Sequence, residues 1–250
     1  MRRWLLPVLL VAALVGAWQV AASSGVLASA LGLEDFLVPS PAEIATSLWE
    51  NRSLLAENAW LTPREIALGF GCAVLVGVAF AVAMHLSATL RLAAYPLVIA
   101  SQTIPIVVVS PILVIWLGFG IGPKLAIVAL VCFFPITVAT LDGLRSTDPE
   151  AIKMMRTLDA SRWATFRRLE APNALPQFFS GMRIAVAIAP IGAVFAEWSG
   201  SSSGLGHLIL LDNAQLETAR VFAAVLVLSA MAVALFALLA LAERRVVTWR

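Results

Sequence analysis

The sequence predicts an all-α, polytopic membrane protein with six transmembrane helices. Of the 250 residues, 61% are hydrophobic and only 13% are charged, and the mean hydropathy is +0.93. Soluble domains average about 45–50% apolar and about 25% charged residues, and a soluble fold of this size cannot bury such an excess. Composition therefore excludes an ordinary soluble enzyme, a disordered chain and a disulfide-rich secreted module. We expect one transmembrane domain over residues 1–250, with its core at 60–245.

Six segments approach the roughly 20 apolar residues that a membrane-spanning helix needs. They are Trp4–Ala22, Ile66–Leu86, Leu92–Gly118, Leu125–Leu141, Phe178–Trp198 and Val221–Ala242. Pro105 and Pro111 interrupt the third segment. The first follows Arg2-Arg3 and precedes Ala28-Ser29-Ala30, so it also fits a cleaved signal peptide. Its length favours a retained anchor.

The distribution of basic residues indicates the orientation. With the N-terminus inside and six spans, only Arg52, Arg64, Lys124 and Arg220 of the 17 lysines and arginines fall outside. Because positive residues concentrate on the cytoplasmic side, both termini are expected in the cytoplasm. This orientation puts the loop 23–65 outside the cell and the basic loop 142–177 inside. A net charge of +2 is too small to indicate nucleic-acid binding.

The cysteines and histidines indicate no particular chemistry. Cys72 and Cys132 lie in apolar runs and are expected to be small buried side chains, although a bridge between them stays open. His85 and His207 are expected on opposite sides of the membrane, so they cannot form a metal pair. The string from Gly200 to Gly204 matches Gly-x-Ser-x-Gly, but no strand precedes it, and we expect a loop there.

The inner loop begins with a helix signal. In Asp148-Pro149-Glu150 the first residue suits an N-cap, the second the first helical position and the third the first turn. A helix through Leu158 is expected. Asp159 or Ser161 then offers a second cap, so the loop predicts two short helices with a sharp bend between them.

The second loop helix carries an apolar stripe. Trp163, Phe166 and Leu169 follow one another at a spacing of three, and Pro172 and Pro176 are expected to end the helix. A basic amphipathic loop also suits adhesion to anionic lipid headgroups. The bend and the double cap favour a docking surface, because a lipid-adhering helix needs no fixed turn.

This loop resembles the one in the membrane-spanning permease subunits of binding-protein-dependent ABC importers. Their signature is Glu-Ala-Ala, three residues, Gly, nine residues, Ile, one residue and Leu-Pro. Here Lys153-Met154-Met155, Asp159, Leu169 and Ala171-Pro172 meet that spacing. Asp159 stands where the family has glycine, and aspartate tolerates a left-handed conformation better than most residues.

Further segments resemble the branch of this family that imports sulfonates, taurine, nitrate and thiamine precursors. They are Ile104-Pro105, Ser110-Pro111-Ile112, Trp116-Leu117-Gly118-Phe119-Gly120, Phe133-Phe134-Pro135-Ile136, Leu158–Trp163, Gly181-Met182-Arg183, and Glu197 followed by Gly204-Leu205-Gly206. The run from Glu197-Trp198 to Asn213-Ala214-Gln215 is most similar to permeases for the pyrimidine precursor of thiamine. A riboflavin-like substrate is also compatible with the resemblance.

The resemblance implies a type I importer permease fold with a cytoplasmic coupling helix, in the bacterial inner membrane. It implies a second permease subunit, expected to be a copy of this chain, two cytoplasmic ATPase subunits and an extracytoplasmic solute-binding protein. The chain would hold no cofactor and be no enzyme, because ATP and Mg would be bound by the ATPase. The closest string to a phosphate-binding loop, Gly118–Lys124, lacks the glycine directly before the lysine.

Two sets of residues are candidates for function. The set expected to couple to the ATPase is Asp159, Ala160, Ser161, Arg162, Trp163, Phe166, Leu169 and Pro172. Trp163 and Phe166 would be its anchors, since buried aromatics dominate interface energetics. The alternative is that Trp163 packs on the protein's own helices. The set expected to line the translocation path is Gln102, Thr103, Ser110, Pro190 and Glu197.

Two of the path residues have alternative roles. Glu197 is an ionisable group near the outer end of a span, which makes it a functional candidate, but it also fits an interfacial carboxylate that reaches water. Gln102 also fits a partner for a backbone group freed by Pro105. Two other functional classes remain possible. One is an intramembrane enzyme, for which the sequence offers no convergent catalytic set. The other is a vitamin-capturing subunit that works without a binding protein.

Overall fold

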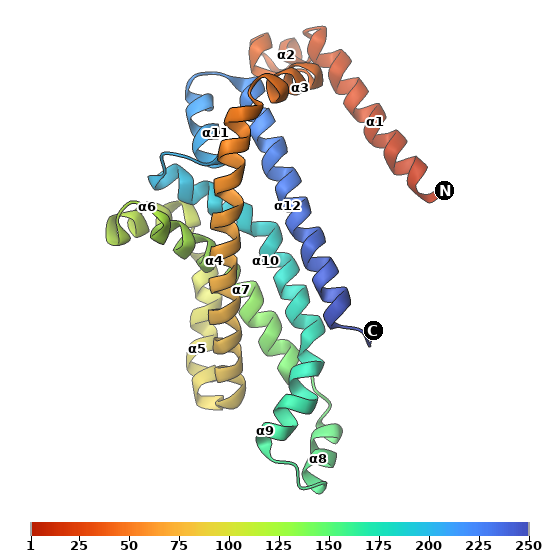
Figure 1. Cartoon of the computed structure of the whole chain (residues 1–250), viewed down its shortest axis with the longest axis vertical. Coiled ribbons are helices and arrows are strands. Elements are labelled where there is room, and N and C mark those ends of the chain that lie inside the picture. Colours follow the sequence, from red (N-terminus) through yellow and green to blue (C-terminus); the bar gives the residue numbers. More distant parts are fainter. Residues whose placement is uncertain (1, 250) are drawn as a thin grey trace. The chain divides into compact units, whose positions relative to one another are not determined.

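The computed structural model describes residues 2–249, with the side chains of 6–249, and these residues form helices and no strand (Figure 1). The elements are α1 (Arg2–Ser23), α2 (Val26–Leu31), η1 (Asp35–Leu37), α3 (Pro41–Glu50), α4 (Arg52–Leu86), α5 (Ala88–Ala100), η2 (Ser101–Thr103), α6 (Ile106–Leu117), α7 (Ile121–Arg145), α8 (Pro149–Thr157), α9 (Arg162–Thr165), η3 (Phe166–Glu170), α10 (Ala171–Gly200), α11 (Leu205–Ala214) and α12 (Thr218–Val246). The predicted all-α class is confirmed.

Within the described residues, five helical segments are long and apolar enough to span a membrane, and a bent pair makes a sixth. The bent pair is the third predicted span. It turns by 102° between Ala88–Thr103 and Ile106–Leu117, so α6 runs across α5 instead of along it (Figure 1). Pro105 causes the break, because it donates no backbone hydrogen bond and holds Ile104 in an extended conformation. Pro111 was also expected to interrupt this span, but it lies inside α6, which continues to Leu117.

Helix α4 is longer than the second predicted span. It begins at Arg52 rather than at Ile66 and has 35 residues. At about 1.5 Å per residue it is about 52 Å long, while the hydrocarbon core of a bilayer is about 30 Å thick. The first turns of α4 therefore belong to the segment 23–65, which is mostly helical.

The chain divides into two compact units, of which the first comprises Met1–Leu61 and Ser202–Ala230. Here α3 begins with a capping box, in which the Ser40 hydroxyl accepts a hydrogen bond from the Glu43 amide and the Glu43 carboxylate accepts one from the Ser40 amide. Arg220 of α12 donates two hydrogen bonds, of 2.8 and 2.7 Å, to the buried carboxylate of Asp212 in α11. These contacts fix the ends of short helices that have little core of their own.

The second unit comprises Thr62–Ser201 and Met231–Arg250, and its centre is the pairing of α7 with α10. Gly181 permits the close approach, because a Cβ built there would lie 2.5 Å from the Pro135 carbonyl oxygen and 2.6 Å from the Ala139 Cβ. Small residues at such crossings are typical of membrane helices, which associate by close packing. Beside this pair, α5 folds back along α4 (Figure 1), and Ala94 and Val98 of α5 pack with Met84 of α4.

The two cysteines differ in environment. Cys132 is buried in the α7–α10 core, as expected, but Cys72 is exposed, and both thiols are free. The prediction for Cys72 was wrong because an apolar run in a membrane helix need not face protein. Lipid chains are as apolar as leucine side chains, so hydropathy does not distinguish the packed face from the lipid-facing one.

We expect Gly181→Ala to destabilise the protein by about 1–3 kcal/mol, because the added methyl group overpacks the α7–α10 crossing. This cost exceeds the gain of about 1 kcal/mol that alanine has over glycine in a helix. Gly71→Ala is the matched control, since a Cβ there meets nothing within 4 Å. Thermal unfolding of the purified protein in detergent measures both. Equal midpoints for the two variants would contradict the packing argument.

Candidate functional site

The first loop helix forms as its sequence predicts. Asp148 is the N-cap of α8, and its Oδ1 accepts a hydrogen bond of 2.9 Å from the Glu150 amide. Pro149 occupies the first helical position, and α8 ends at Thr157 with Leu158 as its C-cap. Each of these residues satisfies a local requirement of a helix end.

The bend after α8 divides two roles between Asp159 and Ser161. Asp159 has φ of 55°, in the left-handed region, and its amide bonds to the Arg156 carbonyl at 3.0 Å. Ser161 is the cap of the next helix, and its Oγ accepts a 3.2 Å hydrogen bond from the Ala164 amide. The aspartate therefore makes the turn for which the family signature has glycine, and the serine starts α9.

Pro172 and Pro176 were predicted to end the second loop helix, but the helix continues past both prolines. α9, η3 and α10 form one continuous helical run over Arg162–Gly200. Pro172 lies in the first turn of α10, directly after η3, which is a π-helical turn. The widened turn accommodates the missing proline N–H without stopping the helix.

Three large apolar side chains of the loop are exposed. Met154, Leu158 and Trp163 are 59%, 69% and 65% exposed. The Trp163 ring stacks on Phe166, with centroids 5.4 Å apart, while Phe166 is half-buried with its ring 6.3 Å from that of His85. Trp163 is therefore not packed into the protein's own helices. An exposed apolar group of this size is typical of an interaction surface.

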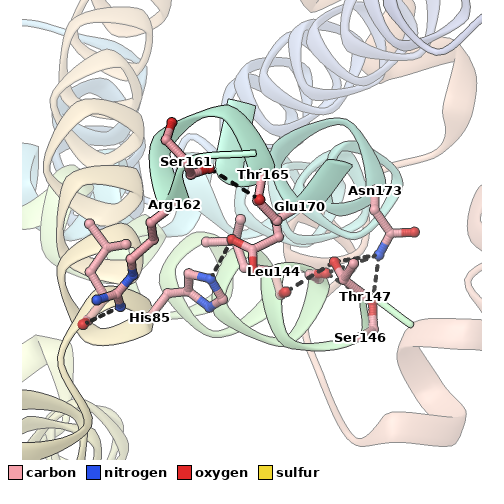
Figure 2. Close-up of polar contacts among 11 residues, drawn as sticks. His85, Leu144, Ser146, Thr147, Ser161, Arg162, Thr165, Glu170 and Asn173 are labelled. Carbon is pink, nitrogen blue, oxygen red and sulfur yellow. Dashed lines mark hydrogen bonds and ion pairs between the residues drawn. The ribbon is translucent and has the colours of Figure 1, made fainter. Parts of the chain in front are cut away.

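The loop segment is joined to the C-terminal end of α4 (Figure 2). The Nε2 of His85 lies 2.9 Å from Oε2 of Glu170, and the Arg162 guanidinium donates a 2.8 Å hydrogen bond to the Leu86 carbonyl. Neither contact was predicted from the sequence. Glu170 lies at the end of η3, and no local pattern indicated that the π turn would direct it towards His85.

A cavity of about 370 Å³ lies beside this junction. Its walls include Arg156 and Arg162 together with His85 and Glu170. At the other end of the loop, the Asn173 amide lies within hydrogen-bond distance of Ser146 and Thr147, each at 3.2 Å (Figure 2). The loop therefore begins and ends at fixed positions, and its middle carries the exposed apolar side chains.

Three of the expected path residues are packed between helices. The fully buried Ser110 hydroxyl of α6 donates a 2.9 Å hydrogen bond to the Phe195 carbonyl of α10. Glu197 is fully buried and accepts a 2.7 Å hydrogen bond from Thr62 of α4. The alternative that Glu197 is an interfacial carboxylate reaching water is therefore wrong, because the side chain is fully buried. Pro190 is buried within α10.

The other two path residues lie at the break between α5 and α6. Gln102 is exposed and lines a cavity of about 300 Å³, whose walls include Pro105, Leu130 and Ile188. The Thr103 hydroxyl donates a 2.8 Å hydrogen bond to the Ala100 carbonyl, and Ser101 does the same for Val98 at 2.7 Å. These hydroxyls contact carbonyls beside the break, and Gln102 lines the cavity.

A further buried pair, which was not predicted from the sequence, joins α4 to α7. Lys124 lies 2.6 Å from Glu65, and their side chains are 10% and 8% exposed. The sequence placed both residues outside the spans, and only the extra length of α4 brings Glu65 beside Lys124. Buried charges persist where they are paired, so this contact fixes α4 against the first turn of α7.

The chain matches known proteins over most of its length. Residues 73–248 match the family described as binding-protein-dependent transport system inner membrane component. A protein of Haemophilus influenzae named "Probable ABC transporter permease protein" is 36% identical over 234 residues, covering 94% of this chain and 93% of that protein. The "Formylaminopyrimidine transport permease protein ThiX" of Halalkalibacterium halodurans is 36% identical over 218 residues, covering 87% of each chain.

A solved structure shares the fold. It is described as an amino acid ABC transporter with histidines, and it superposes with a TM-score of 0.63 over 80% of this chain and 97% of that chain. The sequence identity is 18%, so this likeness concerns the arrangement of helices alone. It supports the predicted type I importer permease fold.

Asp159→Gly should leave the bend intact, while Asp159→Val should destabilise it. A left-handed conformation costs a side chain about 1–2 kcal/mol, and the penalty is larger for a β-branched residue and absent for glycine. Limited trypsin digestion of the purified protein measures the effect, with faster cleavage expected in the loop 142–177 of the valine variant. Equal protection of the valine variant and the wild type would show that the left-handed turn is not required.

Proposed function

The chain belongs to the family of binding-protein-dependent transport system inner membrane components, and from this premise we propose that it imports a pyrimidine precursor of thiamine. As a family member it is a membrane-spanning ABC permease for small substrates and is not itself an enzyme. ABC importers of this family work in general with an ATPase and a solute-binding protein. The likeness to the formylaminopyrimidine permease, over 87% of the chain, carries the choice of substrate.

The cavity at the break between α5 and α6 suits a small heteroaromatic ring. It measures about 300 Å³ and its walls are mostly Ile, Leu and Pro side chains, with Ser101 and Gln102 as polar members. Ligand sites have volumes of about 300–1,000 Å³ and are mostly apolar with few polar groups. A glutamine amide both donates and accepts hydrogen bonds, as the edge of an aminopyrimidine requires.

The remaining path residues would shape this cavity without touching the substrate. Ser110 and Glu197 tie α10 to α6 and α4, respectively. Pro190 lies on α10 between Ile188 and Ile191, which both line the cavity. The Thr103 hydroxyl bonds to the Ala100 carbonyl beside the break and stabilises the backbone there. Broken helices at a substrate site are a common feature of transporters, because irregular backbone is tolerated where it lines a cavity.

The loop 142–177 would dock on a cytoplasmic ATPase that binds ATP and Mg. Trp163 is the anchor and Phe166 supports its ring, while Met154 and Leu158 are further exposed apolar side chains of the loop. The rest of the set has structural roles: Asp159, Ala160 and Ser161 form the bend, Arg162 holds it to α4, and Leu169 and Pro172 lead through the π turn into α10. In this proposal both termini are cytoplasmic, and two copies of the chain form the path.

Proteoliposomes that contain this permease, its ATPase and its binding protein should take up formylaminopyrimidine when ATP is supplied. Riboflavin, taurine and an aliphatic sulfonate complete the panel, and uptake of labelled substrate is the measurement. Gln102→Leu should lower uptake of the pyrimidine, since it removes the amide group from the cavity wall, while Gln102→Asn should retain part of the uptake. Uptake of taurine alone would contradict the substrate. Full uptake without the binding protein would support the vitamin-capturing alternative.

Trp163→Ala should weaken binding of the ATPase by about 2 kcal/mol or more, the range of an interface hot spot, which is about thirty-fold in affinity. Co-purification of the ATPase and ATP-driven uptake measure the loss. The matched control is Trp49→Ala, because Trp49 is 71% exposed in the segment expected on the opposite side of the membrane. Normal ATPase binding by the Trp163 variant would remove Trp163 from the coupling role.

A further inference from the structure

We propose that the contact between His85 and Glu170 is a positioning device that makes α4 move with the coupling loop. The inference rests on the proposed function, since it assumes an ATPase that pulls on the loop 142–177. His85 and Glu170 would transmit that movement to α4, which is a role separate from docking. Neither residue belongs to the exposed surface that would meet the ATPase.

The junction is built from three contacts that reinforce one another. The His85 and Glu170 side chains lie 2.9 Å apart and are only 15% and 14% exposed, so their interaction is less screened than it would be in water. The Arg162 guanidinium bonds to the Leu86 carbonyl at 2.8 Å, where a cation suits the last turn of a helix. The Phe166 ring lies against His85.

The π turn gives the junction its geometry. Phe166 and Glu170 are the first and last residues of η3, and both contact His85. One additional residue in a helical turn rotates everything that follows by about 100°. The turn therefore sets the face on which Trp163 of α9 lies separately from the face of α10. π turns inside helices occur frequently at functional sites.

Helix α4 then carries the movement towards the cavity. In the second unit α4 is bonded at His85 to the loop, at Glu65 to Lys124 of α7 and at Thr62 to Glu197 of α10. The cavity at the broken span is walled by Leu130 and Val131 of α7 and by Ile188 and Ile191 of α10. A continuous helix joined at one end to the loop and at the other to both walls is a physical route for coupling.

The test compares transport with ATP hydrolysis in the complete complex reconstituted in proteoliposomes. His85→Ala and Glu170→Ala should keep the ATPase bound and active, but formylaminopyrimidine transported per ATP should fall about five-fold or more, the lower range of energetic coupling between sites. The double variant should lose no more than either single variant. The conservative Glu170→Gln, which keeps a hydrogen-bonding oxygen, should retain most of the ratio.

The matched control is the exposed pair Glu150 and Lys153, which lie 3.2 Å apart in the same loop with side chains 82% and 71% exposed. Replacing both by alanine should leave the transport ratio unchanged. A normal ratio in His85→Ala, or an equal loss in the control, would overturn the inference. If neither His85→Ala nor Glu170→Gln retains the bound ATPase, the pair is needed for assembly of the complex, and the inference is also overturned. If the wild-type complex fails to transport, the proposed function itself falls.

Discussion

The constraint on which the structure depends is that the backbone of an apolar span must satisfy its own hydrogen bonds, because lipid offers none. This constraint makes the described chain helical from Arg2 to Val246 apart from short turns. It also requires that backbone groups at a break in a span find other partners. The extended residues Ile104 and Pro105 lie where the hydroxyls of Ser101 and Thr103 contact nearby carbonyls and where a cavity opens.

A second theme is that helix α4 is held both by close packing and by polar contacts. Ile66 and Ala73 of α4 belong to the same buried cluster as residues of α7 and α10. In addition, α4 is bonded at Thr62, Glu65 and His85. Polar contacts are directional and can be exchanged, while packed cores resist change. The proposed transmission of movement through α4 relies on these polar contacts.

The candidate site was predictable where the chemistry is local. Asp148, Pro149 and Ser161 act on their own helix ends, so sequence alone indicates the caps and the bend. The continuation through Pro172 was not predictable, because a proline at that position fits either a helix end or the first turn of a new helix. The environment of Glu197 was not predictable either, since its hydrogen-bond partner Thr62 is 135 positions away in the sequence.

The sequence by itself determined the class, the number of spans, the capped loop helices and the resemblance to ABC importer permeases, because composition, hydropathy and cap chemistry are properties of short segments. Tertiary structure alone decided which apolar residues face protein, as Cys72 and Cys132 illustrate. It also decided that Gln102 faces a cavity and that His85 meets Glu170. The physical reason is that these facts depend on which helix lies opposite, and neither hydropathy nor spacing along one helix contains that information.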